Sequence, residues 1–224
     1  MLFLLYRYAE GAGNSVRFSG LIDIDFLSPT ELICTDSDNH CLRVADFKLS
    51  PPQTSTFAGI CETAGNRDGR RENLALFQKP RCTAVNNDKS TLFVLDDSVT
   101  LRMIDLESDD VMTVVTFDTT SPDIKLFGNN LYFPHVTSIA GFDLDTKEES
   151  IVAGGTSSGN AFGSFEETRF NNASKLLLWR DDVKVLLLVV DYGADRFVGL
   201  FLRCTCMKYA SSNNIVPIGA FHFC

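Results

Sequence analysis

A short apolar segment that ends in aspartate recurs along the chain and limits the folds that are possible. Its copies are ELICTD at 31–36, TLFVLD at 91–96, NLYFPH at 130–135 and LLLVVD at 186–191. They begin 60, 39 and 56 residues apart, which fits a repeat of about 40–50 residues with loop insertions. Turn residues and further apolar strands follow each copy, without helical periodicity. The pattern predicts an all-β chain, a β-propeller of four-stranded antiparallel blades with about four blades visible.

The repeat divides the chain into four predicted units and a remainder. The propeller would occupy 1–202 and leave 203–224 as an irregular C-terminal tail, and its approximate units are 9–58, 59–115, 116–153 and 154–202. Residues 2–8 could supply the outer strand that the fourth unit lacks and so close a four-bladed ring. Alternatively, the four blades are part of a six-bladed propeller, because an open arc leaves two blade faces uncovered.

Charge and hydropathy exclude several classes of function. The 224 residues carry a net charge of −9, with 29 acidic and 20 basic side chains, which disfavours a nucleic-acid partner. No apolar run reaches the 18 or so residues that a membrane helix needs. The N-terminal MLFLLYRY has too short an apolar run for a convincing signal peptide.

The cysteines and a sequon bear on the compartment. Seven cysteines leave at least one without an intramolecular partner. Two disulfides are possible: Cys34–Cys41 across the turn at 36–39, and Cys61–Cys82 around the long loop of the second unit. Asn172 begins an Asn-Ala-Ser glycosylation triplet. These features slightly favour an extracellular protein, although the N-terminus is not a convincing signal peptide.

The loop at 59–80 holds the strongest concentration of basic residues in this acidic chain. In a four-stranded blade, the loop that enters the first strand lies at the same end as the turn between the second and third strands. The loops at 59–80 and 154–172 are therefore expected beside the turns at Asp36, Asp96, His135 and Asp191. Binding sites tend to lie on such loops. The candidate binding residues for an anionic group or an acidic partner are Arg67, Arg70, Arg71, Lys79 and Arg81.

Other polar residues suggest structural roles. Asp36, Asp96 and Asp191 open turns, where an aspartate commonly bonds its own backbone. Arg43 and Arg102 hold matching positions and are expected to pair with acidic groups of the turns or of the neighbouring blade. The three histidines are scattered, and no catalytic or nucleotide-binding motif is present. No catalytic residue, metal ligand or cofactor is predicted.

Three segments carry a family resemblance. ELICTDSDNHCLRVAD, TLFVLDDSVTLRMIDL and VLLLVVDYGADRFVGLF look like NHL repeats, in which a strand, a turn aspartate and an Ile/Leu-Arg pair follow one another. The stretch STFAGICETAGNRDGRRENLALFQKP is similar to the linker of that family, with Ala-Gly, a Gly-rich loop and Phe-x-x-Pro. His135 departs from the pattern in the third unit. The resemblance implies a β-propeller, commonly of six blades.

The resemblance implies a non-catalytic binding module that presents a loop-rich face to a protein or another macromolecule. One alternative is a propeller enzyme similar to the metal-dependent lyases and lactone hydrolases, which would need converging metal ligands. Another is a fragment of a larger NHL protein without an independent function. RNA binding is a further, disfavoured alternative. The sequence leaves the oligomeric state open.

Overall fold

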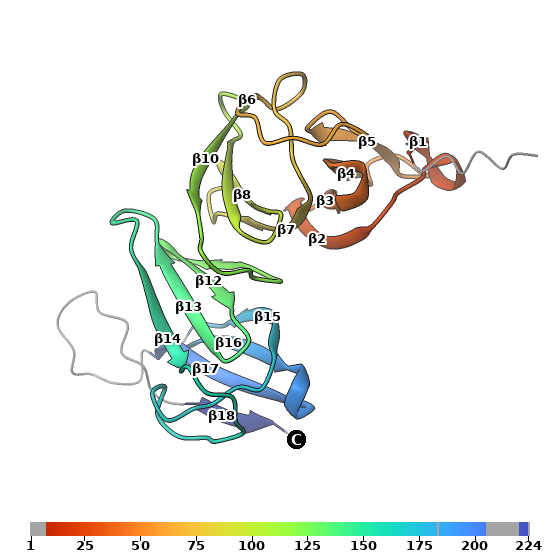
Figure 1. Ribbon diagram of the computed structural model, residues 1–224. Coiled ribbons are helices and arrows are strands. Elements are labelled where there is room, and N and C mark those ends of the chain that lie inside the picture. Colours follow the sequence, from red (N-terminus) through yellow and green to blue (C-terminus); the bar gives the residue numbers. More distant parts are fainter. Residues whose placement is uncertain (1–7, 183, 205–219, 224) are drawn as a thin grey trace, which may run out of the picture. The chain divides into compact units, whose positions relative to one another are not determined.

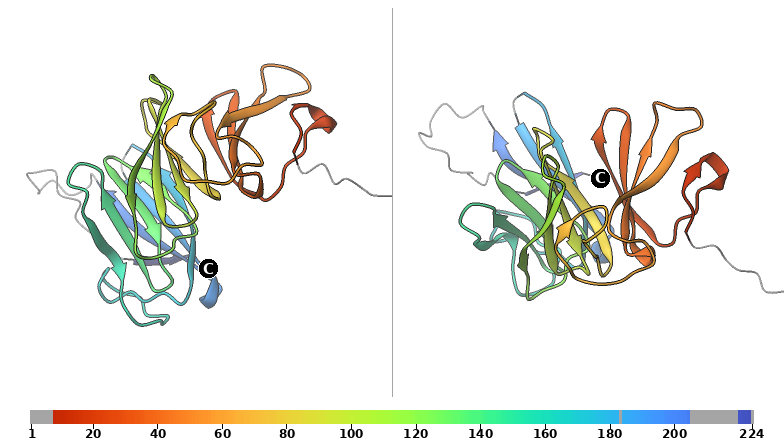
Figure 2. Two further views of the ribbon diagram at one scale, coloured as in Figure 1. Left: turned by 45° about the horizontal axis from the view of Figure 1, so that its top comes forward. Right: turned by 90° about the horizontal axis from the view of Figure 1, so that it is seen from above.

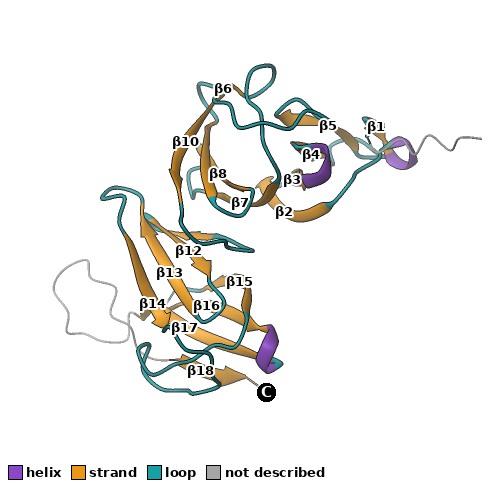
Figure 3. Cartoon of the chain, viewed as in Figure 1, coloured by secondary structure: helices purple, strands orange, loops and turns teal. Residues whose placement is uncertain are grey.

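The computed structural model describes residues 8–182, 184–204 and 220–223 (Figure 1). Within them the chain forms four antiparallel sheets and three single-turn 3-10 helices, η1 (Gly13–Ser15), η2 (Ser37–Asn39) and η3 (Tyr192–Ala194) (Figure 3). The chain divides into two compact units, Met1–Thr120 and Ser121–Cys224, which we call unit 1 and unit 2. Each unit contains two sheets.

The two sheets of unit 1 each contain four main strands and a two-residue fifth strand. Sheet 1 has the order β1 (Gly11–Ala12), β5 (Gln53–Ala58), β4 (Cys41–Asp46), β3 (Glu31–Asp36) and β2 (Leu21–Ser28). Sheet 2 has the order β6 (Gly69–Arg70), β10 (Asp110–Thr116), β9 (Thr100–Asp105), β8 (Thr91–Asp96) and β7 (Pro80–Val85). In both sheets the four main strands follow one another in chain order, as in a propeller blade.

The two sheets of unit 2 repeat this topology, and Figure 2 shows them from two further directions. Sheet 3 has the order β11 (Lys125–Phe127), β12 (Asn130–Pro134), β13 (Ser138–Asp143) and β14 (Glu149–Gly154). Sheet 4 has the order β15 (Ala173–Arg180), β16 (Lys184–Asp191), β17 (Arg196–Cys204) and β18 (Ala220–Phe223). The predicted all-β fold with four antiparallel blades is therefore confirmed.

Each unit buries its core between its two sheets. In unit 1, Ile33 and Leu42 of sheet 1 pack with Leu92, Val94 and Ile104 of sheet 2. The core of unit 2 joins the aromatic and aliphatic side chains of sheet 3 and of the following loop to one face of sheet 4; it contains Tyr132, Ile139, Phe170, Leu187, Val189, Val198 and Leu200. Alternating apolar residues supply both cores, because successive strand residues point to opposite faces.

A carboxylate also joins neighbouring blades in each unit. Asp23 of β2 accepts a hydrogen bond from the backbone N–H of Thr83 on β7, at 2.9 Å. Asp123, just before β11, accepts one from the backbone N–H of Leu176 on β15, at 2.8 Å. Asp23 lies near the start of the first strand of its blade, and Asp123 lies just before the first strand of its own. In both cases the donor lies on the first strand of the next blade. The repeat therefore extends to the contact between blades.

Two short parts of the C-terminal segment 203–224 are extended. Strand β17 continues to Cys204, and Ala220–Phe223 pairs antiparallel with Phe197–Leu200 as the fourth strand of sheet 4. Pairing at an edge needs only a short extended backbone, which a four-residue segment supplies without a recognisable pattern. The outer strand of sheet 4 is thus β18, whereas residues 2–7 lie outside the described part of the chain.

The predicted disulfide pairs are wrong. Cys41 is bonded to Cys61, with 5.1 Å between their Cα atoms, whereas Cys34 and Cys82 are buried and lie outside this disulfide. The register explains the error: Asp36 lies opposite Cys41, so Cys34 lies opposite Arg43 two residues away. Cys61 lies two residues after Gly59, where the chain enters the loop. The backbone N–H of the next residue, Glu62, donates to the carbonyl of Asn39 at 2.8 Å, and this contact brings Cys61 beside Cys41.

Non-reducing peptide mapping checks this connectivity. We expect a peptide pair joined through Cys41 and Cys61, and we expect Cys34 to be alkylated only after unfolding, because burial raises the pKa of its thiol to about 11. A bridge that joins Cys41 or Cys61 to any other cysteine would contradict the assignment.

Candidate functional site

A buried ion pair anchors the basic loop at 59–79. Asp96, at the end of β8, accepts hydrogen bonds from the backbone N–H groups of Gln78 and Lys79, at 2.9 and 2.7 Å. The Arg102 guanidinium of β9 lies 3.6 Å from the same carboxylate, and both side chains are buried. Burial raises the pKa of Asp96, against the lowering effect of these donors and of Arg102.

Arg102 also holds the middle of the loop. Its Nη1 donates to the carbonyl of Leu76 at 3.1 Å, and its Nη2 donates to the carbonyl of Arg67 at 3.0 Å and to Asp68 at 2.8 Å. The guanidinium stacks over the Phe77 ring, 5.1 Å from its centroid. One arginine therefore shapes most of the loop, and this explains why a long Gly-containing segment adopts a defined path.

The loop aspartate contributes to the same arrangement. Burial alone would raise the pKa of Asp68, but hydrogen bonds from Thr113 and the charge of Arg102 outweigh it and lower that pKa. Asp68 thereby links the loop to β10 through the backbone N–H of Thr113, at 3.0 Å.

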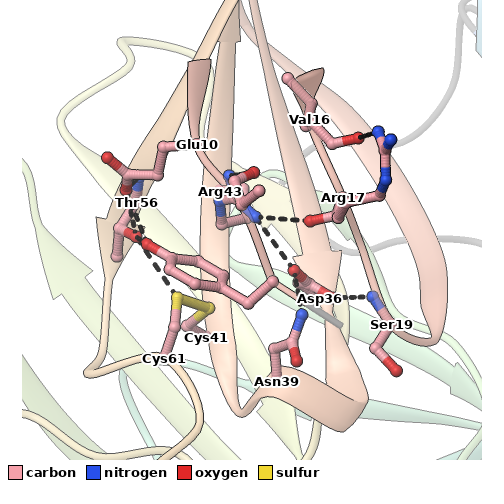
Figure 4. Close-up of polar contacts among 12 residues, drawn as sticks. Glu10, Val16, Arg17, Ser19, Asp36, Asn39, Cys41, Arg43, Thr56 and Cys61 are labelled. Atoms are coloured by element: carbon pink, nitrogen blue, oxygen red, sulfur yellow. Dashed lines mark hydrogen bonds and ion pairs between the residues drawn. A yellow bond between two sulfur atoms is a disulfide. The ribbon is translucent and has the colours of Figure 1, made fainter. Parts of the chain in front are cut away.

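An equivalent buried Asp–Arg ion pair occurs in sheets 1 and 4. Figure 4 shows Asp36 accepting from the backbone N–H of Ser19, at 2.7 Å, and from Arg43, at 3.2 Å. In sheet 4, Asp191 accepts from Arg196 at 2.9 Å and from two backbone N–H groups of the preceding loop, at Asn171 and Asn172. The expected pairing of the matching arginines with turn acids is confirmed. The turn aspartates are expected to bond the backbone of their own turns, but the backbone N–H groups that donate to them lie in the loop before the blade.

Sequence reasoning missed Arg196. Arg43 and Arg102 lie opposite the strand residue two before their aspartate, whereas Arg196 lies directly opposite Asp191. Arg196 therefore lies two residue pairs nearer the turn than Arg43 and Arg102 do, at a position that the repeat pattern does not assign to arginine. Asp191 had no assigned cationic partner in the sequence interpretation, and a search for one near its turn could have identified Arg196.

Sheet 3 has neither the aspartate nor the arginine of this ion pair. His135 takes the aspartate position, and Ala140 lies at the rung where sheets 1 and 2 have arginine. The segment before this blade, 117–124, is also much shorter than the loops at 59–79 and 155–172. The ion pair thus accompanies the long loops, which indicates that holding a loop is its role.

The five predicted binding residues fall into three groups. Arg71 is bound to Asp109, at 2.5 Å, and stacks on Phe57; Lys79 lies 3.9 Å from Asp38. Arg67 and Arg70 donate to the carbonyls of Leu74 and Ser108. Arg81 is half-buried, and its buried Nε has no partner among the described residues.

The charges of Arg67 and Arg70 consequently remain available. Both side chains are exposed, and among the described residues no carboxylate pairs with either of them. Leu74, which accepts from Arg67, is 49% exposed, and Ile60 at the loop's start is 36% exposed. The loop surface therefore combines uncompensated positive charge with apolar area. This combination is typical of protein interfaces, where arginine is enriched and apolar contacts supply burial.

The turn of sheet 1 meets this loop, as the topology predicted for unit 1. The His40 Nδ1 lies 2.5 Å from the carbonyl of Gln78, and Glu62 bonds Asn39 as described above. His40 itself adopts a left-handed backbone conformation, with φ of 60°.

Other predicted features are placed as follows. The backbone N–H of Asn172 bonds Asp191, and its sequon residue Ser174 donates to the carbonyl of Val190 at 3.2 Å. In the described part of the chain, no three His, Cys, Asp or Glu residues are grouped so that they could hold a metal ion. The described residues also include no helix long and apolar enough to cross a bilayer.

Comparison by sequence finds neither a matching family model nor a matching curated protein. Solved structures do match. An auxiliary nutrient-binding protein from Bacteroides ovatus has a TM-score of 0.66 at 11% identity, over 91% of this chain and 46% of that one. A second such protein, from Bacteroides thetaiotaomicron, gives 0.54 at 13% identity, over 96% and 59%.

A structure of the nidogen/laminin complex also matches, with a TM-score of 0.51 at 10% identity, over 93% of this chain and 82% of that one. The chain spans about half the length of the nutrient-binding proteins. At these identities the likeness concerns the fold alone. The chain therefore has a β-propeller fold that it shares with solved binding proteins.

Proposed function

We propose that this chain is a non-catalytic binding module of the NHL type, whose Gly59–Lys79 loop captures an acidic segment of a partner protein. The observation that carries the proposal is the exposed, uncompensated pair Arg67 and Arg70 on a loop that Arg102 fixes from within. A rigid loop loses little conformational entropy on binding, which favours affinity.

The neighbouring surface supports a protein as the ligand. Leu74 and Ile60, which belong to the same loop as the two arginines, offer apolar contact area. The net charge of −9 repels nucleic acid at long range, whereas the local positive charge attracts a carboxylate-rich peptide. Matched propellers include nutrient-binding proteins and one found in a protein complex, and both are compatible with a binding role.

Panning a random peptide library on the purified chain tests the proposal. We expect the selected peptides to be rich in Asp and Glu, because each would pair with Arg67 or Arg70. The double substitution Arg67→Gln with Arg70→Gln should weaken binding of a selected peptide about tenfold or more, as measured by fluorescence anisotropy. Added salt should also weaken it.

A matched control is Lys48→Gln with Lys147→Gln, which removes the same charge from exposed turns that are not part of residues 59–79. It should leave the affinity unchanged. Selected peptides without acidic residues, or equal binding by the Arg67→Gln/Arg70→Gln protein, would contradict the proposal. Arg71 is unsuitable for this test, because its contacts with Phe57 and Asp109 make it part of the fold.

A further inference from the structure

An N-terminal arm, Tyr8–Ser19, lies against sheet 1. Its strand β1 pairs with β5, and the backbone N–H of Gly13 bonds the carbonyl of Pro52, at 3.3 Å. The buried Arg43 donates to the carbonyls of Ala9, at 3.0 Å, and Arg17, at 3.2 Å. The arm is thus held by backbone pairing along one edge and by a single guanidinium at its ends.

A polar cluster fastens the start of the arm to β5. One carboxylate oxygen of Glu10 accepts from the Tyr8 hydroxyl at 2.8 Å, and from both the backbone N–H and the hydroxyl of Thr56 at 2.7 Å. The Tyr8 hydroxyl also lies 2.8 Å from the Thr56 hydroxyl. Hydrogen bonding by Thr56 lowers the pKa of Glu10, which keeps the carboxylate ionised as the common acceptor.

The same threonine touches the disulfide. Its hydroxyl oxygen lies 3.3 Å from the Cys61 Sγ, and Figure 4 shows Glu10, Thr56 and the Cys41–Cys61 bond in one connected group. Cys61 is partly exposed, whereas Cys41 is fully buried. One hydroxyl group therefore connects the arm with the only disulfide among the described residues.

We propose that the Cys41–Cys61 disulfide is a redox latch for the N-terminal arm: its reduction loosens residues 8–19 while the sheets persist. The proposal goes beyond the binding function and does not depend on it. Sheet 1 retains its strand pairing without the bond, because β3, β4 and β5 pair through their backbones. The arm has only two residues paired with β5, so it depends more heavily on the Glu10–Thr56 cluster.

The chemical step is thiol–disulfide exchange with a dithiol reductant. A thiolate of the reductant attacks the exposed Cys61 Sγ, the Cys41–Cys61 bond breaks, and Cys41 leaves as a thiolate that takes up a proton. The second thiolate of the reductant then attacks the mixed disulfide and releases Cys61. Two electrons pass from the dithiol, which becomes a disulfide, to the two protein thiols. Cys61 can then move away from Thr56.

Hydrogen exchange of the full chain with and without dithiothreitol tests the latch. The backbone N–H groups of Ala9, Gly13 and Arg17 all bond within unit 1 and report on the arm. We expect them to exchange about tenfold faster after reduction, which corresponds to the loss of one or two net hydrogen bonds. Amides of β8 and β9 should keep their protection. The redox state of Cys41 and Cys61 is verified by mass spectrometry.

The variant Thr56→Val separates the latch from a general effect of the disulfide. It keeps the bond and the size of the side chain but removes the hydroxyl that joins Glu10 to Cys61. Its arm should exchange fast in both redox states. The proposal is overturned by unchanged arm exchange in the reduced wild-type chain, by loss of protection throughout unit 1, or by an undiminished redox response in Thr56→Val.

Discussion

Replacing Arg102 with leucine is expected to lower the free energy of unfolding by about 3–5 kcal/mol. The substitution leaves the buried Asp96 carboxylate without its cation, and it removes four donated hydrogen bonds to Asn66, Leu76, Arg67 and Asp68. Unsatisfied buried acceptors are costly because water does not reach them. Urea denaturation followed by far-UV circular dichroism measures the loss.

The pH dependence of this loss distinguishes a charge effect from a packing effect. Burial already raises the pKa of Asp96, and removal of Arg102 raises it further. An acid whose folded pKa is raised destabilises the fold as pH increases through the window between its unfolded and folded pKa values. The deficit of Arg102→Leu should therefore be larger at pH 7 than below the unfolded pKa of aspartate, about 3.9.

The double variant Arg102→Leu with Asp96→Asn is the matched control. Asparagine removes the charge that needs a cation, so the combined loss should be smaller than the sum of the two single losses. Additive losses, or a deficit that does not change with pH, would show that the pair stabilises the loop by packing alone.

The strand pattern of the sequence is sufficient to predict four blades. ELICTD and its copies are short, mainly apolar runs that end at a turn and recur along the chain, so their placement in the second strand of each blade follows from this pattern and its spacing. The topology of a blade then correctly places the loop at 59–79 beside the turn after Asp96.

Contacts that depend on exact register could not be predicted in this way. The single-turn helix η2 and the left-handed His40 move Cys41 opposite Asp36, and this shift of two residues cancels the expected Cys34–Cys41 bridge. The pairing of Arg71 could not be predicted either, because its partner Asp109 lies 38 positions away in the sequence. Only the folded chain shows that Arg67 and Arg70 have no carboxylate partner among the residues that the structure describes.

Gly154 shows that one repeated residue can be essential for the fold. Gly59 and Gly154 both follow alanine at the end of an outer strand, and both have positive φ, 90° and 92°. Their backbone amides bond loop carbonyls, those of Arg71 and Phe165 respectively. The Ala-Gly pair thus marks the position where the chain leaves a blade and enters a long loop.

Replacing Gly154 with alanine is expected to lower the free energy of unfolding by roughly 3–5 kcal/mol. A Cβ at this position would lie 2.5 Å from the carbonyl oxygen of Thr137 and 2.7 Å from the Cα of Ser138. Both are backbone atoms of the strand entry beside it, so they cannot rotate away as a side chain would. The positive φ adds strain for any residue with a Cβ.

Gly128→Ala is the control, because Gly128 has a φ of 62° and no atom within 4 Å of the corresponding Cβ position. It should cost about 1 kcal/mol, from the left-handed backbone alone. Urea denaturation followed by the fluorescence of Trp179, the only tryptophan, measures both variants within unit 2. Equal losses would mean that φ alone sets the requirement for glycine. A much larger loss for Gly154→Ala would mean that close backbone packing at the start of the loop imposes it.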